Sequence, residues 1–259
     1  MFEAHLSRGT ILKKLSEAIK ELITDANFDC SEAGIALQAM DNSHIALVSL
    51  LLNSDIFSTY RCDRGFSLGV NLTTFNKLLK CAGNDDAITL KANEDFPETL
   101  TLSFDNSTND KFCEYVLKLM NINQEHLSVP ETEYDAEVVL SSAEFQRICR
   151  DMMVIGETVR IDIDKGEIKF ITEGDLGNGS IKLKPVDSIN KPEENIEINV
   201  TNEVSLQFSL KYLMSFTKGS PLSDQVKLHL AENTPLLVEY TLNSSNNSYL
   251  RYYLAPKLD

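Results

Sequence analysis

An internal repeat constrains the fold of this chain more than any other feature of its sequence. The segment from Phe66 to Phe104 recurs from Val204 to Leu242 at a constant offset in numbering. The identical pairs at that offset are Ser67/Ser205, Leu68/Leu206, Leu72/Leu210, Lys80/Lys218, Asp86/Asp224, Leu90/Leu228, Glu94/Glu232 and Pro97/Pro235. Upstream, a slightly smaller constant offset aligns Leu12/Phe145, Leu15/Ile148, Phe28/Ile161, Ile35/Ile168 and Leu37/Phe170. The chain therefore contains two copies of one domain.

Each copy combines amphipathic helices with alternating strands. Helical spacing of apolar residues predicts a helix after Ser7, with Ile11, Leu12, Leu15, Ile19 and Leu22 on its buried face. Its counterpart opens at Ser141-Ser142-Ala143-Glu144, a capping-box pattern, and is expected to bury Phe145, Ile148 and Met152. Second helices are expected over 72–80 and 210–218. Alternating runs at 35–39, 45–49 and 226–230 predict half-buried strands, and the fold class is α+β with much antiparallel sheet.

The two copies are joined by a segment with the composition of a linker. Residues 120–134 are polar and acidic, with isolated apolar residues and one proline. We expect an N-terminal domain over 1–119, an extended linker over 120–134 and a C-terminal domain over 135–259.

Charge is segregated along the chain. The formal net charge is −15, which by itself argues against a nucleic-acid partner. The predicted helices at 8–20, 72–80, 142–153 and 210–218 carry +3, +2, 0 and +2, so the rest of the chain carries −22. Lysines on solvated helix faces are ordinary, but their recurrence in both copies favours a basic helical surface for a phosphate backbone. No base-reading module is visible, so such binding would be independent of sequence.

Signals for catalysis or metal binding are weak. The five cysteines are scattered and form no Cys-x-x-Cys pair, so we expect reduced thiols and neither a disulfide framework nor a zinc site. The run Asp162–Gly166 has too few ligands for a calcium loop, and the glycines between 174 and 179 lack the Lys-Ser/Thr of a phosphate loop. Both segments are expected to be turns. The sequence thus predicts no catalytic residues, no metal, no cofactor and no membrane-spanning segment.

Three stretches resemble one known family. Residues 34–48, residues 61–81 and the C-terminal Tyr252–Lys257 are similar to signatures of the proliferating cell nuclear antigen family, and the similarity extends over essentially the whole chain. This resemblance implies a homotrimeric DNA sliding clamp in the nucleus: a ring of six domains, closed by pairing a strand near Lys111–Leu117 with one near Asp175–Leu183 of the next subunit. Met153 departs from the polar or basic residue that other members carry.

The resemblance also implies binding residues. Those for DNA are Lys13, Lys14, Lys20, Arg61, Arg64, Lys77, Lys80, Arg147, Arg150, Lys211 and Lys218. Those for client proteins are Met40, His44, Ile45, Leu47, Leu127, Val129, Pro130, Tyr134, Pro235, Tyr253, Leu254, Ala255 and Pro256. Lys165 matches a ubiquitination site. The implied partners are duplex DNA, the replicative polymerase, an ATP-dependent clamp loader, and proteins with a clamp-interacting peptide, such as flap endonuclease and DNA ligase.

Other functions remain open at the level of sequence. A related clamp of heterotrimeric rings would have edges that do not match each other. A nucleic-acid-processing enzyme would show metal-dependent turnover. A scaffold that never encloses DNA would not distinguish circular from linear duplex.

Overall fold

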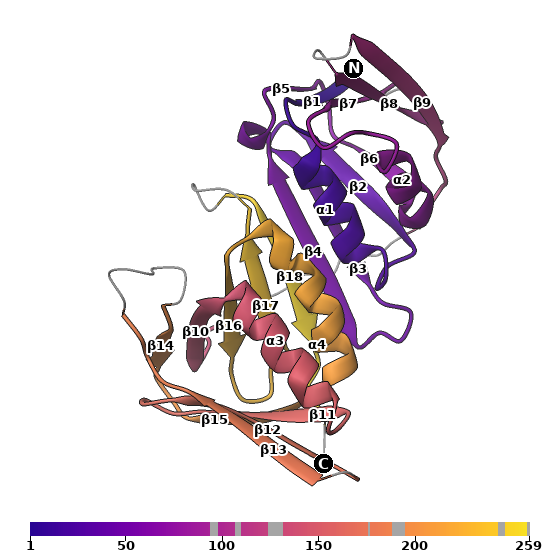
Figure 1. Ribbon diagram of the computed structural model, residues 1–259. Helices are drawn as coiled ribbons and strands as arrows, with labels where there is room; N and C mark the ends of the chain where they lie inside the picture. The colour runs from indigo at the N-terminus through magenta and orange to yellow at the C-terminus, as the bar shows by residue number, and fades with distance from the viewer. Residues whose placement is uncertain are drawn as a thin grey trace. The chain divides into compact units, whose positions relative to one another are not determined.

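The computed structural model describes residues 1–93, 98–106, 110–123, 132–175, 177–187, 195–242 and 247–257. The chain divides into two compact units, each centred on one copy of the repeat (Figure 1). The first comprises Met1–Asn42, Val48–Leu127 and Leu242–Leu250, and the second comprises Ser43–Leu47, Ser128–Thr241 and Arg251–Asp259. The two units thus differ from the predicted domains by the exchange of short segments.

The first unit is built on two antiparallel groups of strands. Their strand orders are β5-β1-β7-β8-β9 and β4-β3-β2-β6. The bounds are β1 (Phe2–Leu6), β2 (Asp25–Ser31), β3 (Gly34–Met40), β4 (Ala46–Asn53), β5 (Thr59–Cys62), β6 (Phe66–Asn71), β7 (Ala87–Ala92), β8 (Thr99–Asn106) and β9 (Lys111–Lys118).

The second unit has the same arrangement. Its strand orders are β14-β10-β16-β17-β18 and β13-β12-β11-β15. The bounds are β10 (Ala136–Ser141), β11 (Thr158–Ile163), β12 (Ile168–Gly174), β13 (Gly177–Leu183), β14 (Glu197–Val200), β15 (Val204–Ser209), β16 (Gln225–Leu230), β17 (Leu236–Thr241) and β18 (Tyr249–Leu254).

Strand register confirms the repeat. Ala4 of β1 lies opposite Leu90 of β7, and Val138 of β10 lies opposite Leu228, the repeat equivalent of Leu90. The strand orders of the two units also correspond position by position. Two copies of one α+β domain are therefore confirmed, as are both predicted turns: Ile163 pairs with Ile168, and Gly174 pairs with Gly177.

Each unit carries one pair of α-helices, and the two helices of a pair pack against each other (Figure 1). The helices are α1 (Thr10–Ile19), α2 (Leu72–Leu79), α3 (Ser142–Met153) and α4 (Leu210–Phe216), with short 3-10 helices η1 (Ser54–Ile56) and η3 (Thr217–Leu222). The helix predicted over 210–218 thus ends its α-helical part early, and Pro221 lies in the 3-10 helix that follows.

The N-termini of α1 and α2 are stabilised by different hydrogen bonds. Asn71 caps α2, since its side-chain oxygen accepts a hydrogen bond from the Thr74 amide at 2.9 Å. Before α1 stands Gly9, whose amide donates to the Asp86 carbonyl at 2.9 Å. A Cβ atom at Gly9 would lie 2.1 Å from a methyl carbon of Ile88, so this close approach requires glycine.

The capping box predicted for α3 is wrong. Ser141 occupies the cap position but makes no side-chain cap hydrogen bond. The Glu144 carboxylate instead accepts from Arg147 at 2.7 Å. The first turn is anchored by the backbone, because the Ser142 amide donates to the Asp224 carbonyl at 2.8 Å. Tertiary structure therefore replaces the local motif.

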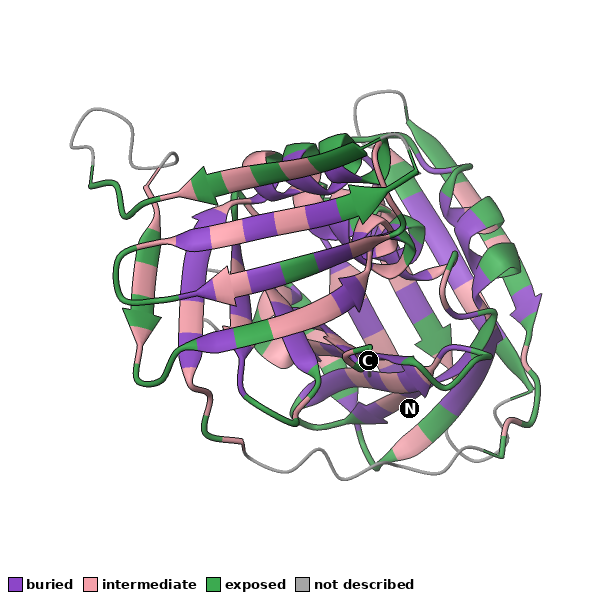
Figure 2. Ribbon diagram, turned by 90° about the horizontal axis from the view of Figure 1, so that it is seen from below, coloured by how far each residue is buried: buried purple, intermediate pink, exposed green. Residues whose placement is uncertain are grey.

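The core of each unit lies between its helices and its strands. Figure 2 shows buried and exposed residues alternating along the strands, as expected for sheets with one covered face. In the first unit, Leu12, Leu15 and Ile19 of α1 line one internal cavity together with Phe75 of α2 and Phe28 of β2. Phe145, Ile148 and Met152 of α3 are buried as predicted, whereas Ile11 and Leu22 are only half-buried.

Candidate nucleic-acid interface and partner sites

Basic side chains gather at the C-terminal ends of the helices. Lys20 and Lys80 are the C-cap residues of α1 and α2, and Lys77 and Arg150 lie in the last turns of α2 and α3. Cations are favourable there, because the carbonyl groups at a helix C-terminus carry partial negative charge. These four basic side chains therefore stabilise their helices and also place positive charge at the helix ends.

In the first unit the predicted lysines differ in their exposure. Lys14, Lys77 and Lys80 are exposed. Lys13 is half-buried, and its ammonium donates to the Ala82 carbonyl oxygen at 2.6 Å, at the end of α2. Lys20 is also half-buried and lies 2.9 Å from the Glu17 carboxylate. Lys13 and Lys20 are therefore held against the protein surface, whereas the side chains of the other three reach solvent.

Glu17 and Asn76 join this group, although the sequence did not single them out. The Glu17 carboxylate lies 2.9 Å from the Lys20 ammonium and 3.7 Å from that of Lys80. Lys20 also donates to the side-chain oxygen of Asn76 at 3.4 Å. The hydrogen bond from Lys20 is the main cause that lowers the pKa of Glu17. The i, i+3 spacing of Glu17 and Lys20 was the available sequence signal for this pair.

The helices of the second unit carry four predicted residues, all exposed. Arg147 is paired with Glu144 at 2.7 Å, which raises the pKa of its guanidinium. Arg150 lies 3.3 Å from Asp151. Lys211 follows the first residue of α4, and Lys218 lies in η3. Surface pairs of this kind contribute little to stability, so these side chains can readily exchange a carboxylate for a phosphate.

Two further predicted DNA-binding residues lie away from the helices. Arg61 is on the edge strand β5, and its guanidinium contacts the Asp63 carboxylate at 2.7 and 2.9 Å. Hydrogen bonds from Arg61 and from the N-terminal amine lower the pKa of Asp63 to about 2. Arg64 is exposed in the turn that follows β5.

Each unit ends in an open sheet edge within the described part of the chain. Strand β9 pairs only with β8, and β13 pairs only with β12. On β9, Phe112 and Val116 are 63% and 59% exposed, which is unusual for large apolar side chains. An unpaired strand with exposed apolar residues is a template for another strand.

The second unit also brings together several residues of the predicted client site. The Ala255 amide donates to the Ile45 carbonyl at 3.1 Å, and the Ile45 side chain is 42% exposed. Pro235 and His44 are exposed too, while Tyr253 and Pro256 are half-buried. Leu254 and Leu47 are buried, so their side chains serve the core. Met40 ends β3 in the first unit and is half-buried.

Tyr134 borders this surface. Its ring contacts that of His229, with centroids 5.2 Å apart, and burial raises the pKa of its hydroxyl. Burial lowers the pKa of His229, which also lies 3.3 Å from Glu137. Leu127, Val129 and Pro130 of the predicted site lie outside the described residues.

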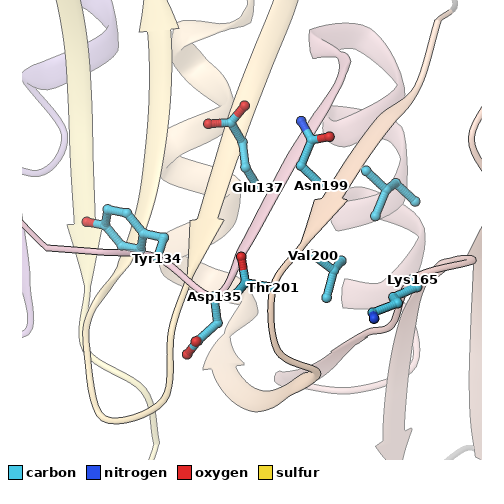
Figure 3. Close-up of a pocket in the computed structure, with 8 residues that line it drawn as sticks. Tyr134, Asp135, Glu137, Lys165, Asn199, Val200 and Thr201 are labelled. Atoms are coloured by element: carbon cyan, nitrogen blue, oxygen red, sulfur yellow. The ribbon is translucent and has the colours of Figure 1, made fainter.

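Lys165 lies in the tight turn between β11 and β12. The Asp164 side chain accepts hydrogen bonds from the amides of Gly166 and Glu167, at 2.7 and 3.0 Å, which fixes the turn. Lys165 is exposed and lines a surface pocket of about 510 Å³, at the opposite end of the lining from Tyr134 (Figure 3). The side chain is therefore accessible to a modifying enzyme.

The described residues offer no group of three or more His, Cys, Asp or Glu side chains able to hold a metal ion. None of the five cysteines, all within the described residues, takes part in a disulfide. Among the helices that the structure describes, none is long and apolar enough to cross a membrane.

Two copies of an α+β domain, each with a helix pair that carries basic side chains and with an open sheet edge, define a DNA sliding clamp. The family model of the proliferating cell nuclear antigen N-terminal domain matches residues 1–126, and the model of the C-terminal domain matches residues 128–257. Proliferating cell nuclear antigen of Chaetomium thermophilum is 54% identical over 258 residues, which cover 100% of this chain and 98% of that relative. The chain belongs to the proliferating cell nuclear antigen family. It is a processivity factor for DNA replication, and it is not an enzyme.

Proposed function

We propose that three copies of this chain close into a nuclear ring whose helices face duplex DNA. The contacts would be made by Lys14, Lys20, Lys77, Lys80, Arg147, Arg150, Lys211 and Lys218, with Arg61, Arg64 and Lys13 adding to the local charge. The observation that carries this proposal is the segregation of charge, +7 on the helices in a chain of net charge −15. A surface of this kind attracts phosphates on one face only.

Such contacts would be weak and indifferent to base sequence. The helix cations are lysines and arginines, several of them paired with carboxylates, and phosphate contacts carry no sequence information. A closed ring needs no tight contact, because it is held on DNA by topology. Weak, salt-screened attraction then permits sliding while a polymerase is held at its template.

Ring closure would use the open edges. Strand β9 of one subunit would pair with β13 of the next, a head-to-tail contact that closes after three subunits. The pairing would cover Phe112 and Val116, the large apolar side chains left exposed on β9. Hydrogen bonding along both strands would supply the geometry, and burial of these side chains would supply much of the affinity.

Clients would bind the surface around Ile45, Tyr134, Pro235 and Tyr253, to which we assign Leu127, Val129 and Pro130 as well. We propose the replicative polymerase, an ATP-dependent clamp loader, flap endonuclease and DNA ligase as partners. A short helix with one aliphatic and two aromatic anchors suits an apolar surface bordered by tyrosines. We also propose the linker 120–134 as the boundary between the domains.

The test of the DNA-facing surface replaces Lys20, Lys77 and Lys80 by alanine. Retention on circular DNA should fall, and the logarithmic salt slope should shrink by roughly 0.9 for each phosphate that the variant no longer touches. The matched control replaces Lys91, Lys169 and Lys227, which lie on strands, and should change neither quantity. An unchanged salt slope in the triple lysine variant would show that these helices do not touch DNA. Equal retention of the wild-type protein on circular and linear duplex would favour a scaffold that does not enclose DNA.

A further inference from the structure

A carboxylate stands between two of the lysines that we place on the DNA-facing surface. Glu17 on α1 contacts Lys20 at 2.9 Å and Lys80 on α2 at 3.7 Å. The Glu17 side chain is 48% exposed and that of Lys80 is 61% exposed, so both reach solvent. One negative charge is thus shared by two cations on the same surface.

The neighbouring groups hold this carboxylate in place. Asn76, with 4% of its surface exposed, accepts a hydrogen bond from Lys20. Hydrogen bonds from Lys20 and from Asn76, together with the charges of Lys20 and Lys80, lower the pKa of Glu17 despite some opposing burial. The carboxylate therefore stays ionised at neutral pH, and a phosphate that approaches either lysine must compete with it.

The fold itself does not require this arrangement, because the second unit lacks it. When the two copies are aligned by their repeat, Glu17 corresponds to Arg150, Lys20 to Met153 and Asn76 to Met214. The helices α3 and α4 nevertheless pack against each other, as α1 and α2 do. The architecture common to the two copies therefore does not depend on this carboxylate.

We infer that the Glu17 carboxylate competes with DNA phosphates for Lys20 and Lys80. This competition lowers the affinity of the ring for DNA and so keeps the ring mobile. The inference rests on the proposed DNA-facing role of these lysines. The exchange needs little free energy, since the carboxylate and a phosphate are alternative partners for the same ammonium groups. Each encounter with DNA then replaces an existing ion pair instead of adding a new one.

The test measures the affinity of the intact ring for a short duplex as a function of potassium chloride concentration. Glu17→Gln keeps the size of the side chain and removes its charge. Affinity should rise roughly three- to tenfold, with a salt slope steeper by about 0.9 for each additional phosphate that the ring touches. Glu17→Asp keeps the charge on a shorter side chain and should raise affinity less than Glu17→Gln does. Glu32→Gln, in the exposed turn between β2 and β3, makes the same change in net charge and should have little effect.

A double-variant comparison separates local competition from general charge. In a background with Lys20 and Lys80 both replaced by alanine, Glu17→Gln should no longer raise affinity. A gain that persists there, or an equal gain from Glu32→Gln, would overturn the inference. If removal of the two lysines leaves wild-type affinity unchanged, the proposed DNA surface itself fails, and the two failures are thereby distinguished. Equal melting temperatures of the Glu17 variants would show that altered folding is not the cause.

Discussion

The Lys13 ammonium lies 2.6 Å from the carbonyl oxygen of Ala82 and so ties α1 to the end of α2. The second unit makes a similar connection with a neutral side chain, because Gln146 donates to the Thr217 carbonyl at 3.4 Å, three residues before the counterpart of Ala82. Lys13 and Gln146 occupy equivalent positions in the two copies of the repeat. What the two copies share at this position is therefore a hydrogen-bond donor, and only the first copy adds a positive charge to it.

Replacing Lys13 should affect stability more than DNA binding. Lys13→Met removes the donor and should lower the free energy of unfolding by about 1–2 kcal/mol, the usual range for a lost hydrogen bond at a partly buried site. Lys13→Gln retains a donor, as at Gln146, and should lose less. Chemical denaturation of both variants checks this. Equal stability of the two would show that the contact with Ala82 contributes nothing.

Acid should destabilise the second unit through His229. Its pKa in the folded protein lies below the ordinary 6.5, because burial outweighs the nearby carboxylates of Glu137 and Glu239. Between pH 6.5 and the lower folded pKa the unfolded state therefore binds more protons, so the free energy of unfolding falls as pH decreases from about 6.5 and levels off below the folded pKa. We expect a shallower pH dependence between 7 and 5 for His229→Gln, measured by urea denaturation. An identical dependence in variant and wild type would exclude His229 as a source of acid sensitivity.

The sheet edges predict the oligomeric state. We expect a native mass of about 87 kDa, three times the 29.0 kDa of one chain. Val116→Glu places a charge on the open edge of β9 and should shift the population to monomers at micromolar concentration. Ile45→Glu makes the same chemical change at another exposed apolar position and should leave the trimer intact. A Val116→Glu protein that remains trimeric in native mass spectrometry would remove β9 from the interface.

Much of this fold could be predicted from local sequence. The repeat indicated the two-copy organisation, and apolar spacing indicated the buried positions Leu15 and Phe145, because burial on one helix face is a periodic property. The capping box at Ser141 could not be judged that way. The first turn of α3 is held instead by the Asp224 carbonyl, which accepts from the Ser142 amide and belongs to a residue distant in sequence.

The binding site was harder to predict from the sequence, for the same reason. Charge counting located the basic helices, but it treated Glu17 only as one negative charge among several. Its position between Lys20 and Lys80 depends on how α1 packs against α2, which a single sequence does not reveal. Likewise, Leu254 was assigned to the client site by resemblance; its side chain is buried, and its part in client binding stays a prediction.

Lys165 should be the regulated lysine of the β11–β12 turn. Its exposure and the fixed turn around Asp164 make the ammonium accessible without local unfolding. Lys165→Arg keeps the charge and should abolish damage-induced ubiquitination of this protein in cells. Lys169→Arg, on the adjacent strand β12, is the matched control and should leave the modification unchanged. Modification of Lys165→Arg at the wild-type level would place the acceptor elsewhere.

The client surface can be tested at Ile45, whose exposed side chain lies on a backbone held by Ala255. An apolar anchor buried by a client helix contributes about 1.5–3 kcal/mol when fully covered, and ordering the client's tail offsets part of this gain, so micromolar affinity is expected. Ile45→Ala should weaken a peptide with one glutamine, one aliphatic and two aromatic anchors by roughly 1–2 kcal/mol, and Leu127→Ala by a similar amount. Val186 is 44% exposed against 42% for Ile45, so Val186→Ala is a matched control that should bind normally. Calorimetry of the wild type and the three variants decides the question. Wild-type affinity in both Ile45→Ala and Leu127→Ala would place client binding on a different surface. Loss of affinity in Ile45→Ala alone would exclude Leu127 from the client site.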